Sequence, residues 1–130
     1  MSYSNLIEFA SEKQKAEWCS GNVDPKLARI FLEAAVFARS KGYPMLRVTS
    51  IYRDANEDVR LGGSGIHVTW RAIDIGAPGW NDNASATVAA EVNRRWVYDR
   101  KRPNLKVALY DEHGTGPHIH FQVHVQTEER

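Results

Sequence analysis

The chain has 130 residues, within the usual size of one domain, roughly 100 to 200 residues. Its 17 basic and 16 acidic side chains leave a formal net charge of +1. A net charge this small gives no overall electrostatic attraction to nucleic acid or to a membrane surface. We therefore expect a single domain over residues 1–130, with no nucleic-acid partner, no membrane partner and only local specificity.

Cysteine usage and the first residues indicate where the protein resides. The single cysteine, Cys19, cannot form an internal disulfide, which fits a reducing compartment. Residues 1–9 have neither the basic start nor the uninterrupted apolar region of a signal peptide. No stretch of the sequence approaches the roughly 20 apolar residues of a membrane span. The expected location is therefore the cytosol of the producing cell.

Three segments have the apolar spacing of amphipathic helices. Residues 5–18 place apolar side chains among charged ones. Asp24 followed by Pro25 is typical of a helix N-cap and first turn, and the helix that they begin is expected to end at Gly42. Residues 84–98 form the third candidate, with an apolar stripe along one side.

Four β-rich segments follow the strand pattern, namely residues 46–53, 71–76, 105–110 and 118–125. The last two predict a hairpin with a long glycine-containing loop. Residues 54–60 are polar and predict no element, and residues 61–65 form a glycine-dense loop. Helices followed by a mainly antiparallel sheet indicate an α+β domain.

Two separated segments supply the side chains that zinc prefers. His67 precedes the second predicted strand, Asp74 lies within it, and His118 and His120 begin the last one. Because side chains alternate along a strand, His118 and His120 share a face, and Asp74 points away from its two isoleucine neighbours. A carboxylate between apolar neighbours is costly unless it is paired or ligated. We therefore interpret these four residues as candidate ligands of a three-ligand zinc site, which leaves a position for water.

The alternative is that each histidine is an ordinary polar residue, which is the usual situation of a lone histidine. Histidine is sparse here, yet three of the five histidines fall within residues 118–124, and a fourth lies just ahead of the strand that holds Asp74. This clustering favours the metal site. His124 lies farther along the predicted strand and is expected to be structural.

Three motifs in order resemble one family. Residues 64–74 resemble the Ser-x-His-x-x-Gly-x-Ala-x-Asp segment of the zinc DD-peptidases, a superfamily that includes the Hedgehog fold. Residues 117–121 resemble its C-terminal His-x-His segment, and residues 49–53 are similar to its Ser-Gly-Tyr-Arg segment. The resemblance covers residues 24–125. It implies a Hedgehog/DD-peptidase-like fold, a small mainly antiparallel sheet with helices packed on one side.

The resemblance also implies roles for individual residues. His67, Asp74 and His120 correspond to the zinc ligands, with His118 beside the metal as an acid/base or a transition-state donor. Arg53 corresponds to the family arginine that can grip a substrate carboxylate, a role that suits a guanidinium fork. The alternative for this arginine is a surface salt bridge with a nearby aspartate, either residue 54 or residue 58.

The sequence departs from the family pattern at several positions. Trp70 stands where the family usually has glycine, and Ser64 lies three residues before the histidine instead of two. The family often places a catalytic carboxylate a few residues ahead of the final ligand, where this chain has Thr-Gly-Pro at residues 115–117. The sequence therefore leaves four candidates for the residue that transfers the proton: His118, Glu112, His113 and Asp111. Glu112 is the carboxylate that we favour among them.

The resemblance implies a zinc peptidase that hydrolyses D-amino-acid-containing bonds of peptidoglycan stem peptides, as a carboxypeptidase or an endopeptidase. A compact peptidase of this kind is similar to phage endolysins, whose action at the cell wall would need separate release. We expect a monomer with a peptidoglycan peptide as its partner. One alternative is a non-catalytic, zinc-stabilised binding module of the same fold, which the missing carboxylate motivates. Another is a structural domain that binds no metal.

Overall fold

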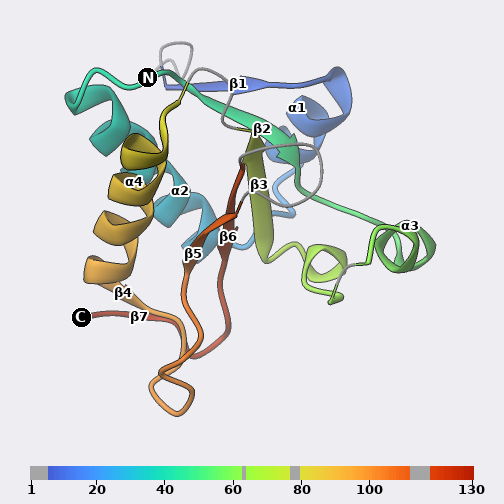
Figure 1. Cartoon of the computed structure of the whole chain (residues 1–130). Helices are drawn as coiled ribbons and strands as arrows, with labels where there is room; N and C mark the ends of the chain where they lie inside the picture. Colours follow the sequence, from blue (N-terminus) through green and yellow to red (C-terminus); the bar gives the residue numbers. More distant parts are fainter. Residues whose placement is uncertain (1–5, 63, 77–79, 112–117) are drawn as a thin grey trace.

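A five-stranded sheet organises the computed structural model, which describes residues 6–62, 64–76, 80–111 and 118–130 (Figure 1). Its strand order is β1-β2-β3-β6-β5. These strands are Ile7–Phe9 (β1), Leu46–Ser50 (β2), Ala72–Gly76 (β3), Ala108–Asp111 (β5) and His118–Gln122 (β6). β1 runs parallel to β2, and the other three pairs are antiparallel. The expected α+β class and the mainly antiparallel sheet are thus confirmed.

The remaining elements are helices and a short ribbon. The helices are Glu12–Cys19 (α1), Pro25–Ser40 (α2), Ala55–Arg60 (α3) and Asp82–Arg95 (α4), with one 3-10 turn at His67–Thr69 (η1). The ribbon pairs Trp96–Val97 (β4) with Glu128–Glu129 (β7). Among the described helices, none has the length and apolar content needed to cross a lipid bilayer.

The helix α2 forms as its sequence predicts. The Asp24 carboxylate accepts hydrogen bonds from the backbone N–H groups of Lys26 and Leu27, which satisfies two of the donors at the start of the helix. Its apolar stripe is buried, and the Phe31 ring meets the Phe121 ring of β6 edge-on, with centroids 5.3 Å apart. A buried side chain of this size contributes about 2 kcal/mol through burial, so this contact anchors the helix on the sheet.

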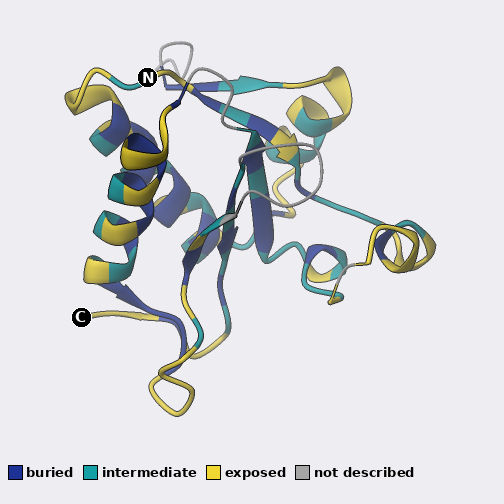
Figure 2. Cartoon of the chain, in the orientation of Figure 1, coloured by how far each residue is buried: buried dark blue, intermediate teal, exposed yellow. Residues whose placement is uncertain are grey.

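The two faces of the sheet differ in chemistry. Four side chains of β3 and β6 are fully buried on the face that packs against α2 and α4: Ile73, Ile75, Ile119 and Phe121. In Figure 2, much of the central sheet and parts of α2 and α4 have the colour of buried residues. Strand alternation turns Asp74 and His120 to the opposite face. In Figure 1, η1 and α3 lie on that other side.

The predicted helix over residues 5–18 is wrong in its first part. Residues 7–9 form β1, an edge strand paired with β2 through the register Ile7 to Leu46, and the helix α1 begins only at Glu12. Leu6 and Ile7 are buried in the core, whereas α1 buries none of its residues. Pairing with the sheet therefore overrides a weak helical pattern.

The polar segment after β2, for which no element was predicted, forms the helix α3. The Asp54 carboxylate accepts a hydrogen bond from the backbone N–H of Glu57 at 2.8 Å. An N-cap aspartate three residues before a glutamate has the spacing of a capping box, so the sequence carried this signal. The helix is short and buries only Asp58.

Several further boundaries differ from those predicted. The helix expected at residues 84–98 begins at Asp82, because the Asn81 side chain caps it by accepting from Ala84 N–H at 2.7 Å. It ends at Arg95, because Trp96 has an extended backbone. The strand expected to end at residue 53 ends at Ser50, and the last strand ends at Gln122 and not at residue 125.

Candidate metal centre

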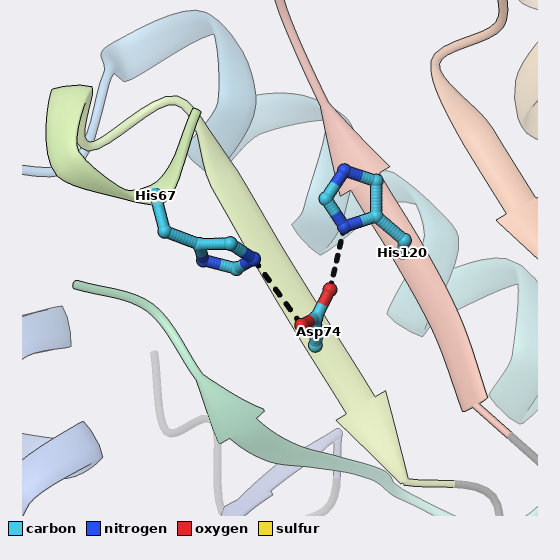
Figure 3. A group of neighbouring side chains, drawn as sticks. All are labelled: His67, Asp74 and His120. Atoms are coloured by element: carbon cyan, nitrogen blue, oxygen red, sulfur yellow. Dashed lines mark hydrogen bonds and ion pairs between the residues drawn. The ribbon is translucent and has the colours of Figure 1, made fainter. Parts of the chain in front are cut away.

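Three of the candidate ligands converge on the polar face of the sheet. Asp74 on β3 and His120 on β6 are direct partners in the antiparallel register, and His67 projects toward them from η1 (Figure 3). Asp74 Oδ2 lies 3.2 Å from His67 Nε2, and Asp74 Oδ1 lies 2.6 Å from His120 Nδ1. One ligand atom of each residue lies within 4.8 Å of the others. This triad, His67, Asp74 and His120, could hold a metal ion.

The backbone fixes the orientation of the His67 ring. Its Nδ1 lies 2.8 Å from the carbonyl oxygen of Ile51, and the ring is only 2% exposed. A carbonyl can only accept, so Nδ1 carries the hydrogen and a neutral ring turns the lone pair of Nε2 toward Asp74. Two electron-rich atoms then face each other at 3.2 Å, which requires a cation between them, either a proton or a metal ion.

The His120 ring is held in the same manner by a side-chain amide. Its Nε2 lies 3.0 Å from Gln122 Oε1, and Gln122 Nε2 donates to the carbonyl oxygen of Lys106 at 2.9 Å, which fixes the direction of the amide. Burial lowers the pKa of His120, but the hydrogen bond and charge of Asp74 and the hydrogen bond of Gln122 outweigh it, so the pKa lies above its ordinary value of 6.5. Without a metal, His120 therefore tends toward the imidazolium form.

Asp74 is a carboxylate kept ionised inside the protein. Burial raises its pKa, but hydrogen bonds and charge from His120 and His67 more than offset this effect and bring the pKa far below its ordinary value of 3.8. Arg53 adds a third contact, with Nη2 3.2 Å from Asp74 Oδ2. A buried charge is stable only when it is paired, and these donors keep Asp74 ionised, which is the form in which a carboxylate binds a cation.

Arg53 contacts the triad directly. Its guanidinium lies between Asp74 and Asp58, with Nη1 3.5 Å from Asp58 Oδ1, and only 16% of the side chain is exposed. The alternative prediction, a surface salt bridge of Arg53 with residue 54 or residue 58, is therefore correct for the partner Asp58, but the ion pair is largely buried and does not lie on the surface. Because both ends of the guanidinium are engaged by protein carboxylates, the grip on a substrate carboxylate stays a prediction.

Asp58 ties α3 to the loop that carries His67. The other oxygen of this carboxylate, Oδ2, accepts a hydrogen bond from the backbone N–H of Gly65 at 2.8 Å, and the residue is 3% exposed. It thus links the end of β2, through Arg53, with the residues immediately before η1. Asp58 thus positions the loop before His67 and reaches Asp74 through Arg53.

A β-bulge in β2 adjusts the backbone beside the triad. Val48 pairs with Ile75, yet Ser50 pairs with Asp74, so Thr49 is the extra residue. The bulge turns Ser50 to the face of Asp74, and the next residue, Ile51, is fully buried with its carbonyl at His67. Bulges of this kind are frequent beside functional sites.

The other predicted residues lie around the triad. His118 is half-buried on β6, two residues from His120 and on the same strand face, and it pairs with Gly76 and Asp111. Glu112 and His113 lie outside the described residues, and Asp111 is described only as the last residue of β5.

His124 is remote from the triad. It lies beyond the end of β6, its ring centroid is 5.7 Å from that of Tyr98, and its Nδ1 accepts a hydrogen bond from the backbone N–H of Gln126. This placement agrees with the structural role expected from the sequence.

The sequence interpretation missed three groups that position the triad: Gln122, Asp58 as a link to Gly65, and the Ile51 carbonyl. Strand alternation puts Gln122 on the face of His120, and this signal could have identified it. The Asp58 link depends on an α3 helix that was not predicted. The Ile51 carbonyl has no side-chain signal at all.

Trp70 has an unusual backbone conformation at the end of η1. It has a left-handed backbone with φ of 62°, it ends η1, and its carbonyl accepts from Asp24 N–H at 3.0 Å. Such a backbone normally favours glycine. The Trp70 ring stacks on Tyr52 with centroids 4.6 Å apart and an interplanar angle of 18°. The turn after η1 therefore has a non-glycine residue in a left-handed conformation, with its ring packed on Tyr52.

Comparison with known proteins finds no relative, since no family model, no curated protein and no solved structure matches the chain. The case for a metal centre therefore rests on the geometry of the triad.

Proposed function

We propose that this chain is a zinc-dependent peptidase that hydrolyses D-amino-acid-containing bonds in peptidoglycan stem peptides. One observation carries the metal part of the proposal. Each histidine of the triad has one ring nitrogen within 3.0 Å of an oxygen outside the triad and turns the other nitrogen toward Asp74. Histidines that bind metals are usually oriented by such outer contacts.

The donor set favours zinc among the common divalent ions. Two imidazoles and one carboxylate suit an ion of intermediate softness, and three protein ligands are typical of a catalytic zinc site. Zinc in such a site supplies a water of lowered pKa, about 7, and polarises a peptide carbonyl. These are the two properties that amide hydrolysis needs from a metal.

The remaining tasks fall to neighbouring side chains. His118, on the strand face of His120, is the proposed proton carrier. Arg53, 3.2 Å from Asp74, adds positive charge beside the triad, which would stabilise negative charge developing on a substrate. Glu112, in the segment before β6, is the alternative proton carrier.

The substrate class rests on the motif resemblance. Residues 49–53, 64–74 and 117–121 resemble zinc DD-peptidase segments, and this order supports an endolysin-like carboxypeptidase or endopeptidase. The proposal places the monomer in the cytosol of its maker, so it would need separate release to reach a cell wall.

The test is hydrolysis of purified peptidoglycan by zinc-loaded protein. Mass spectrometry should detect new amino or carboxyl termini within the stem peptides. His118→Ala should lower the rate by about 100-fold while zinc stays bound, because general acid–base catalysis typically contributes 10²–10⁴-fold. His124→Ala is the matched control and should keep the wild-type rate. Peptidoglycan left unchanged by zinc-loaded wild type across pH would sink the peptidase proposal.

A second candidate is a non-catalytic, zinc-stabilised binding module. One observation favours it: among the described residues, Asp58 is the carboxylate linked to the triad through Arg53, and both its oxygens are already engaged by Arg53 and Gly65. Stoichiometric zinc with no turnover would support this candidate. Zinc below about a tenth of an equivalent in untagged protein would exclude both candidates, leaving a structural domain without metal.

A further inference from the structure

A groove of about 510 Å³ adjoins the triad, and the segments that carry the two histidines form its walls. Gly65 and Ile66 line it directly ahead of His67 in the chain. Gln122 lines it from β6, with Oε1 3.0 Å from His120 Nε2. A ligand in this groove would therefore contact the residues just before His67 and also Gln122, which orients the His120 ring.

The groove is positively charged. None of its nine described lining residues is acidic, whereas two are arginines, Arg71 and Arg102. Arg102 is already committed, because its Nε lies 2.9 Å from Asp99 Oδ2 and its guanidinium lies over the Tyr98 ring at 5.5 Å. The charge left to be balanced by a ligand is that of Arg71.

Arg71 has no carboxylate partner within the part of the chain that the structure describes. Its Nε donates to Thr69 Oγ1 at 3.2 Å, and this contact orients the side chain while the terminal nitrogens remain available. The residue is half-buried, where an uncompensated charge is unfavourable. A planar guanidinium that is already oriented suits a carboxylate, which it can bind with two parallel hydrogen bonds.

The contrast with Arg53 strengthens this assignment. Arg53 contacts Asp58 and Asp74, so a substrate carboxylate would have to displace a protein carboxylate to reach it. Arg71 requires no such exchange. It also directly precedes β3, the strand of Asp74, so it belongs to the same rigid frame as the triad.

We infer that the groove at Arg71 binds a carboxylate of the peptide substrate and so fixes which bond reaches the triad. This inference rests on the proposed peptidase function and adds a specificity determinant to it. The carboxylate has two possible sources, the terminal carboxylate of the peptide or an acidic side chain within it. The shared chemistry is a single carboxylate bound by one guanidinium.

The experiment compares three synthetic D-alanine-containing peptides. One has a free terminal carboxylate, one is its carboxamide, and one is a carboxamide with an internal glutamate. Binding is measured by calorimetry on metal-free full-length protein, where hydrolysis does not interfere, and turnover is measured on zinc-loaded protein. Arg71→Gln should weaken binding of the preferred carboxylate peptide at least tenfold and leave the plain carboxamide unchanged.

Two further variants serve as controls for charge and for folding. Arg71→Lys keeps the charge without the fork and should restore part of the affinity, and Arg94→Gln, which removes an exposed arginine from α4, should match wild type. Thermal melting of all variants shows whether each is folded. The tighter of the two carboxylate peptides identifies the source of the anion.

The outcomes separate the two proposals. Carboxylate binding that depends on Arg71, without hydrolysis, supports the groove and contradicts the peptidase. Hydrolysis that is equally fast in Arg71→Gln supports the peptidase and overturns the groove. An equal loss for carboxylate and carboxamide peptides, or no binding of any of them by wild type, also overturns the groove assignment.

Discussion

Asp74 and His120 are paired residues on adjacent strands, and a hydrogen bond of 2.6 Å joins Oδ1 of the carboxylate to Nδ1 of the ring. Because Asp74 is ionised, its carboxylate can only accept, so the proton of this hydrogen bond is on His120 Nδ1. A metal ion bound by the triad would take its place, so protons and metal compete for the same pair of ligands. The chemistry of the apo protein is thus a direct test of the site.

Asp74→Asn should lower the pKa of His120. Burial by itself lowers that pKa, and Asp74 is the main opposing cause, so removing the negative charge should bring it below its ordinary value of 6.5. An NMR titration of the imidazole C–H signals measures the change. Asp99→Asn, which removes a carboxylate bonded to Arg102, is the control and should leave the pKa of His120 unchanged. A His120 pKa that stays raised in Asp74→Asn would contradict the pairing.

The stability of the metal-free protein should depend on pH in a defined direction. His120 has a raised folded-state pKa, so its contribution is complete below 6.5 and is lost as pH rises through the folded value. The folded-state pKa of Asp74 is lowered, so the contribution of Asp74 to the stability of the fold is complete above pH 3.8 and is lost as the pH falls through the folded-state value. The pair therefore stabilises the fold most between these two values.

Urea denaturation at about pH 5 and about pH 9 with a chelator present measures this dependence. The wild type should lose stability at the higher pH, and His120→Gln should lose less. An equal loss in both proteins would assign the alkaline effect to other groups.

Zinc should stabilise the folded protein through the triad. A ligand that binds only the native state at a free concentration of 1,000 times its Kd adds about 4 kcal/mol, which raises the melting temperature. His67→Ala and His120→Ala should abolish most of this increase, whereas His124→Ala should retain it, since His124 lies beyond β6 beside Tyr98. A zinc response that survives the triad variants would place the ion elsewhere.

The sequence predicted the metal-ligand candidates better than the groups that orient them. Strand alternation indicated four candidate ligands, and the motif resemblance implied His67, Asp74 and His120 among them. The structure brings these three together, and Asp74 and His120 meet because they pair across adjacent antiparallel strands. Nothing local indicated that the Ile51 carbonyl would orient His67. That contact depends on the bulge in β2, which arises from packing between strands.

The secondary-structure errors have a similar origin. α2 was predicted correctly because its cap, its proline and its apolar stripe all agree. β1 was predicted as helix because its few apolar residues fit either period, and only the neighbouring β2 decides between them. Agreement among several local signals thus made α2 predictable, whereas β1 depends on its pairing with β2.

Asp58→Ala should cost about 2–3 kcal/mol of stability, more than an ordinary surface change. It removes a buried carboxylate and leaves two donors, Arg53 and Gly65 N–H, without that acceptor, and leaving such groups unsatisfied costs about 1–3 kcal/mol each. Asp54→Ala removes only the N-cap of the same helix and should cost about 1 kcal/mol. Urea denaturation compares the two. Equal losses would mean that Asp58 stabilises α3 alone and does not hold the loop before His67.

Trp70→Gly tests whether stacking outweighs backbone strain. A left-handed residue other than glycine costs about 1–2 kcal/mol, which glycine would recover. Against this, the stack on Tyr52 contributes about 0.5–1.5 kcal/mol beyond burial, and the half-buried indole adds part of the about 2–3 kcal/mol typical of a large apolar side chain. Since the losses exceed the gain, the variant should be less stable by about 1 kcal/mol while zinc binding persists, because the turn is unchanged.

A double-mutant cycle isolates the stacking. In a Tyr52→Ala background, Trp70→Gly should cost about 1 kcal/mol less than in wild type, because the partner ring is already gone. Urea denaturation gives the four free energies of unfolding. Additive effects would show that the two rings do not stabilise each other. In that case Trp70 would be retained through its contacts with the rest of the core, in spite of its strained backbone.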